Sequence, residues 1–77
     1  MEAKEIFELI LKADDALKYA TEDKLPARAR QARQFLVMAR EEARAAGNDS
    51  LVQQAEQRLT DLDSIIPAEP GQSGDAP

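Results

Sequence analysis

The chain carries carboxylates, hydroxyls and guanidinium groups, but none of its 77 residues is histidine or cysteine. The common catalytic triads and most transition-metal sites depend on those two residue types. The nearest approach to a paired-carboxylate motif is Asp61 and Asp63. Residues two apart on a helix point in different directions, so these two side chains should not converge on a metal ion or a substrate.

The hydroxyl groups and glycines offer no better reaction centre. Ser50 stands at an expected helix start, Ser64 near a helix end, and Ser73 in a C-terminal tail. Gly47 stands alone and the other two glycines fall in the tail, so there is no glycine-rich loop to hold a phosphate. We therefore expect no catalytic residue, no metal site and no cofactor, and we predict that the protein is not an enzyme.

Arginines supply the clearest charge signal. Residues 24–40 carry five bases and no acid (+5), between an acidic segment 1–23 (−4) and an acidic segment 41–77 (−6), within a net charge of −5. On a helix, Arg33, Arg40 and Arg44 lie within about 40° of one another, with Arg30 just outside them. We call these four residues the arginine stripe. It predicts a nearby anion, which could be a partner segment, nucleic acid or the chain's own acids: Glu5, Asp14, Glu56, Asp61 and Asp63.

Three apolar stripes at helical spacing position these groups. Steps of three and four residues put each set on one face of a helix. The second set is nearly all alanine, so neighbouring helices can approach closely there. The stripes are Ile6, Ile10, Ala13, Leu17 and Ala20; then Ala29, Ala32, Leu36, Ala39, Ala43 and Ala46; then Leu51, Val52, Ala55, Leu59, Leu62 and Ile65 or Ile66.

Capping and breaking residues separate the three helices. Pro26 suits the first turn of a helix, Leu25 before it is disfavoured in helical geometry, and Asp23 is a candidate cap or first-turn acid. Gly47 suits a left-handed helix end. Asn48, Asp49 and Ser50 are all candidates for the next N-cap, and Ser50 with Gln53 could form a capping box.

The sequence thus predicts an all-α domain over residues 1–66, with helices at about 2–21, 26–46 and 50–66. Short connections favour antiparallel neighbours, so the fold should be a three-helix bundle or a short helical array. The proline- and glycine-containing tail, residues 67–77, is predicted to be disordered. No run reaches the roughly 20 apolar residues of a membrane span, and no targeting segment is evident. We expect a cytoplasmic protein without a membrane partner.

Some large apolar residues lie outside the stripes. Phe7 and Leu11 lie about 100–140° from Ile6 around the first helix, and Phe35 and Met38 lie on the flank of the second helix opposite the arginine stripe. A broad core face could absorb the two phenylalanines. Leu11 and Met38 are harder to bury, and exposed residues of this size mark interfaces. We take Phe7, Leu11, Phe35 and Met38 as candidate partner-binding residues.

Residues 31–67 resemble a tetratricopeptide-type helical hairpin. Two antiparallel helices meet at a tight turn, Gly47-Asn48-Asp49, with small residues at their contact. Ala55 matches the family's small position, Leu59 its large position and Pro67 its terminating proline. Leu62 and Arg40 depart from the Ala and Gly that the family prefers at those positions, and no second copy is present. The resemblance implies a peptide-binding groove.

These observations favour a small non-enzymatic protein–protein interaction module, an adaptor, assembly subunit or regulatory binder. Its partner would be another protein or a second copy of the chain. The alternative is a nucleic-acid or phosphate binder, which would use the bases of residues 24–44: Lys24, Arg28, Arg30, Arg33, Arg40 and Arg44. The flanking acids oppose a polyanion, and few aromatic residues are present for base stacking. A third interpretation is a structural domain of a longer chain, with the tail as a linker.

Overall fold

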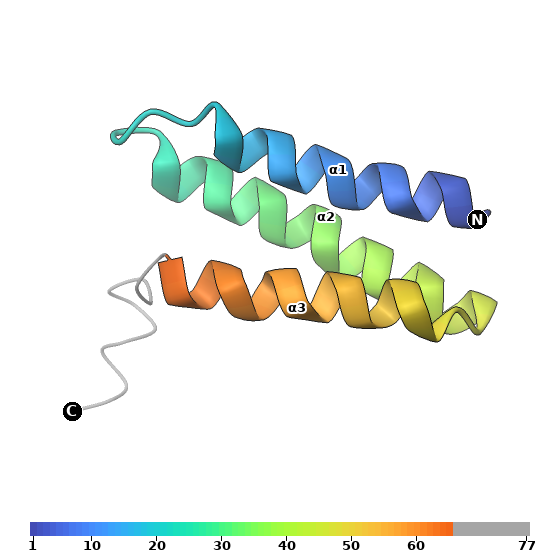
Figure 1. Cartoon of the computed structure of the whole chain (residues 1–77). Helices are drawn as coiled ribbons and strands as arrows, with labels where there is room; N and C mark the ends of the chain where they lie inside the picture. The colour runs from blue at the N-terminus through green and yellow to red at the C-terminus, as the bar shows by residue number, and fades with distance from the viewer. Residues whose placement is uncertain (66–77) are drawn as a thin grey trace.

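The computed structural model describes residues 1–65, and within them the chain forms three α-helices and no strand. The helices are α1 (Ala3–Lys18), α2 (Leu25–Ala46) and α3 (Asp49–Ile65). Consecutive helices run antiparallel, and α2 lies between the other two (Figure 1). It packs along both α1 and α3, whereas α1 and α3 approach each other much less. The predicted all-α fold is confirmed; the tail, residues 67–77, and position 66 lie outside the described residues.

One apolar core is shared by all three helices. Its larger members are Ile6 and Ile10 from α1, Leu36 from α2, and Leu51 and Leu59 from α3. The rest is mainly alanine. We call these buried small residues the alanine seam: Ala13, Ala32, Ala39, Ala43 and Ala55. Most residues of the predicted stripes are therefore buried in the core. The exceptions are Leu17, Ala20 and Val52, which are partly buried, and Ala46, which is exposed at the end of α2; nothing is described of the side chains at positions 65 and 66.

The first helix begins and ends close to charged and aromatic residues. The backbone N–H of Glu2 donates to the Glu5 carboxylate at 2.9 Å, which satisfies one of the free donors at the helix start. α1 ends at Lys18, three residues before the predicted end at position 21. At Tyr19 (φ −103°, ψ 10°) the backbone leaves helical geometry, and the Ala20 N–H donates to Leu17 in a tighter final turn.

The start of α2 differs from the sequence prediction. The helix begins at Leu25, although Leu25 precedes a proline and was expected to lie outside it. A residue before proline is disfavoured in helical geometry but not excluded from it, and Pro26 costs nothing in the first turn because no partner is needed for its missing N–H. Asp23 does not cap this helix; it accepts a hydrogen bond from the Thr21 hydroxyl at 2.7 Å.

The turn between α2 and α3 uses two of the predicted residues. Gly47 is left-handed, with φ 70° and ψ 24°, and its N–H donates to Arg44 while that of Asn48 donates to Ala43. Asn48 is the N-cap of α3, because its side-chain oxygen accepts the Leu51 N–H at 3.1 Å. This bond selects Asn48 from the three candidates. The hydroxyl of Ser50 instead accepts a long hydrogen bond from Gln54, at 3.5 Å.

Replacing Gly47 with alanine should lower the free energy of unfolding by about 1–2 kcal/mol, because the left-handed conformation strains any residue with a Cβ. No atom lies within 4 Å of the added Cβ, so a steric clash contributes nothing. Gly47→Asn should cost less than Gly47→Ala, since asparagine tolerates this conformation. Urea denaturation followed by circular dichroism checks the order. Equal losses for the two variants would contradict the conformational explanation.

Candidate interaction surface

Two members of the arginine stripe are paired with carboxylates of α3. The Arg33 guanidinium binds the Asp63 carboxylate, and Nη2 of Arg44 lies 3.1 Å from the Glu56 carboxylate. Both ion pairs join α2 to α3, and two of the five acids expected beside the stripe are therefore found there. Exposed pairs of this kind stabilise a fold by up to about 1 kcal/mol each.

The remaining stripe residues lie at the surface of α2. Glu41 of the same helix binds two arginines of the stripe: its Oε2 lies 3.2 Å from Arg40 Nε and 3.3 Å from Arg44 Nη1. This carboxylate offsets the repulsion between two like charges four residues apart. Arg30 is exposed on the same side of α2. The stripe thus serves in part to hold the chain's own helices together.

The other expected acids have different partners. Asp61 accepts a hydrogen bond from Gln57 of its own helix at 3.1 Å, whereas Asp63 binds α2. Asp61 and Asp63 therefore do not share a site. Glu5 accepts the Glu2 N–H at the start of α1. No group of three acidic residues among residues 1–65 is placed to hold a metal ion.

Within residues 1–65, the Arg58–Asp14 ion pair links α1 to α3, and the sequence analysis did not predict it. Nε of Arg58 lies 3.1 and 3.2 Å from the two carboxylate oxygens of Asp14, and Nη1 of Arg58 donates to the Gln54 carbonyl at 3.5 Å. The Asp14 carboxylate had been expected to face the arginine stripe. The flank of α1 that carries Asp14 faces α3 instead. The contact therefore shows which side of α1 lies toward α3 and which lies toward the arginine-bearing α2.

The four candidate apolar residues differ in exposure. Phe7, Leu11 and Met38 are 39%, 43% and 47% exposed. Phe35 is half-buried and packs against the core. The core therefore absorbs Phe35 in part, but it leaves the other three in contact with solvent.

These residues do not form one patch. Phe7 and Leu11 share a flank of α1 with Asp14, which binds α3, because residues three, four and seven apart lie on the same side of a helix. Phe35 lies on the other side of α1, in an open groove between α1 and α2. Met38 is one turn beyond Phe35 on α2. The structure brings Phe7 together with Leu11, and separates both from Phe35.

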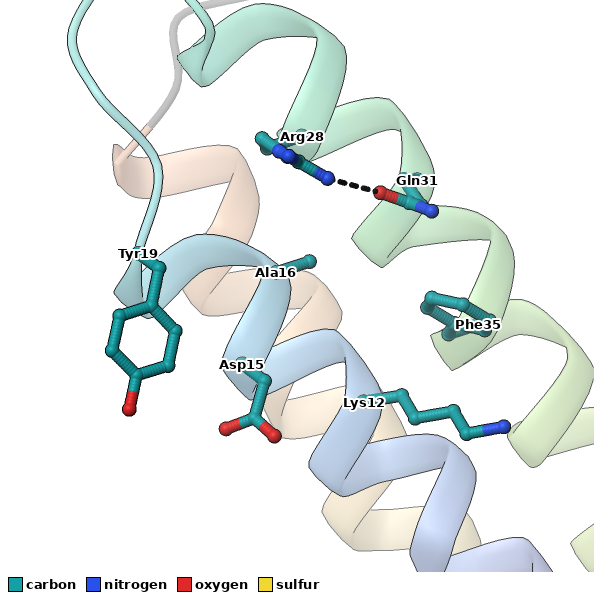
Figure 2. Close-up of a pocket in the computed structure, with 7 residues that line it drawn as sticks. All are labelled: Lys12, Asp15, Ala16, Tyr19, Arg28, Gln31 and Phe35. Atoms are coloured by element: carbon teal, nitrogen blue, oxygen red, sulfur yellow. Dashed lines mark hydrogen bonds between the residues drawn. The ribbon is translucent and has the colours of Figure 1, made fainter.

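The α1–α2 groove has mixed polarity. Figure 2 shows Phe35 and Gln31 of α2 across from Lys12 and Ala16 of α1. Arg28 donates to the Gln31 side chain at 3.2 Å within the groove. Asp15 and Tyr19 complete the lining, and the Lys18 ammonium lies 5.4 Å from the centre of the Tyr19 ring. Apolar contact in this groove comes mainly from one half-buried ring.

Comparison with protein-family models, with curated proteins and with solved structures gives no match. The resemblance to a tetratricopeptide hairpin stays a prediction. Among the described helices, none has the length and apolar character needed to cross a membrane.

Proposed function

We propose that this chain is a small non-enzymatic protein–protein interaction module that binds its partner through Phe7 and Leu11 on α1. The observation that carries the proposal is their exposure, 39% and 43%, beside a core that is already closed. Ile6 and Ile10, on the core face of the same helix, are fully buried. Large apolar side chains that a fold does not need, grouped within one helical turn, are typical of an interface.

Charge favours a protein partner over nucleic acid. Arg33 and Arg44 are bound to carboxylates of α3, so a polyanion would have to compete with Asp63 and Glu56 for them. The net charge of −5 would also oppose its approach. The stripe instead orients the helices, and its exposed edge can select among partners by charge. We propose a cytoplasmic location, which the absence of cysteine fits.

Affinity capture after cross-linking, in cells that make the protein, tests this function. Leu11→Lys should keep the fold, since lysine is a good helix former, but it should reduce recovery of the bound protein at least about tenfold, because a charge would be buried at the interface. Gln53→Lys is the matched control: it adds the same charge at an exposed position of α3 and should leave recovery unchanged. Equal recovery with both variants would refute the proposal.

A further inference from the structure

The exposed flank of α1 has an order of residue types that is complementary to itself. Phe7 and Leu11 occupy its middle. Lys4 lies three residues before Phe7, and Asp15 lies four residues after Leu11, so a base and an acid each stand one turn outside the apolar pair. Lys4, Phe7, Leu11 and Asp15 are exposed, as is Glu8, which lies between them in sequence beside Lys4 and Asp15 on the same face of α1. A base at one end and an acid at the other is the arrangement that two antiparallel copies of one helix can satisfy twice.

The angular positions agree with this pairing. At 100° per residue, Lys4 and Asp15 lie within about 20° of each other around α1, with Leu11 beside them and Phe7 further toward α3. A two-fold axis perpendicular to the helices carries each edge of the flank onto the same edge of the partner helix. Lys4 of one copy therefore meets Asp15 of the other, while the apolar residues meet in the middle.

Neither charged residue is paired with another part of the chain that the structure describes. Within residues 1–65 neither Lys4 nor Asp15 has an ion-pair partner. Asp15 stands at the outer edge of the α1–α2 groove, and Figure 2 shows its carboxylate pointing away from α2. By contrast, the neighbouring Asp14 already binds Arg58. The two charges are thus available to a second molecule, and the nearby ion pair holds α1 against α3 in a fixed orientation.

We propose that the chain forms a two-fold symmetric dimer in which α1 packs antiparallel against α1 of a second copy. Phe7 and Leu11 form the centre, and two Lys4–Asp15 ion pairs flank it. This inference rests on the proposed function and names its partner. α1 has only 16 residues, so the interface falls at the small end of protein interfaces and the dimer is weak and concentration-dependent.

Sedimentation equilibrium of the purified full chain, from about 10 µM to about 1 mM, measures the dissociation constant. The wild-type protein should pass from monomer to dimer within this range. Lys4→Asp and Asp15→Lys should each weaken the dimer at least about threefold, because each places like charges across both ends of the interface. The double variant restores both ion pairs with the charges exchanged, so its dissociation constant should return to within about twofold of the wild-type value.

Two controls make the result specific. Lys12→Asp changes charge by the same amount as Lys4→Asp, but Figure 2 shows the Lys12 side chain directed toward α2, whereas the Asp15 carboxylate points away from α2. The dissociation constant should therefore not change by more than about twofold. Leu11→Lys should weaken the dimer at least about tenfold. Lys4→Asp places an acid in the first turn of α1 and Asp15→Lys places a base near its last turn, and each charge is favourable at that helix end. Both variants should therefore keep the fold, which circular dichroism checks.

The dimer proposal is wrong if the wild-type chain stays monomeric throughout this concentration range. It is also wrong if the double variant dimerises no more tightly than either single variant. Failure of the dimer is separable from failure of the proposed function. If Leu11→Lys still abolishes capture of a different protein from cells, the α1 flank is an interface for that protein and only the self-association is wrong. If capture is also unaffected, both proposals fall.

Discussion

Replacing Leu36 with alanine should leave the protein largely unfolded in buffer without denaturant. Leu36 is 1% exposed and is the one large side chain of α2 that is fully buried in the shared core. Deleting a buried leucine side chain costs about 2–5 kcal/mol, since contacts are lost and a cavity remains. A domain of this size is stable by only roughly 3–5 kcal/mol, so the loss is comparable to the whole. Circular dichroism and urea denaturation measure it.

Leu11→Ala is the matched control for Leu36→Ala. It deletes the same atoms from the same residue type, but at a side chain that is 43% exposed on a helix surface. At a protein concentration too low for association, its free energy of unfolding should lie within about 0.5 kcal/mol of the wild type. A Leu36→Ala protein as stable as Leu11→Ala would mean that the α2 face does not form the core as described.

The core itself could be predicted from the sequence because burial follows helical spacing. Ile6 and Ile10, or Ala39 and Ala43, recur at intervals that place them on one face whatever the neighbouring helix is. The ends of the helices are harder to predict from the sequence. α1 stops at Lys18 without a glycine or proline, and the start of α2 at Leu25 depends on a conformation that proline disfavours without forbidding.

The surface could be predicted only in part. Periodicity gives the angle of each residue around its own helix, but it does not say which neighbour faces that side. Spacing alone therefore places Phe7 and Phe35 among the same candidate residues, although they lie on different sides of α1. The pairing of Asp14 with Arg58 was missed for the same reason. This pairing depends on the handedness of the three-helix arrangement, and the residue pattern within a single helix does not contain that information.

The alanine seam decides how closely the helices pack. Ala39 and Ala43 are fully buried on α2, and Ala55 is fully buried on α3. Each buries little area, so hydrophobic stabilisation per residue is small. Their value is that backbones can come close enough for leucine and isoleucine side chains to interdigitate between them. A protein built this way has little tolerance for extra volume at the seam, even when the added atoms are apolar.

Ala39→Leu should therefore destabilise the protein by about 1–3 kcal/mol, because the added carbons force the helices apart or push side chains out of their preferred rotamers. Leucine and alanine are both good helix formers, so helix propensity does not account for such a loss. Ala45→Leu makes the same change at an exposed position of α2 and should shift the free energy of unfolding by no more than about 0.5 kcal/mol. Urea denaturation compares the two. If Ala39→Leu proved as stable as Ala45→Leu, the seam would have room to spare, and close packing of α2 would not be what holds the flanks of α1 in place.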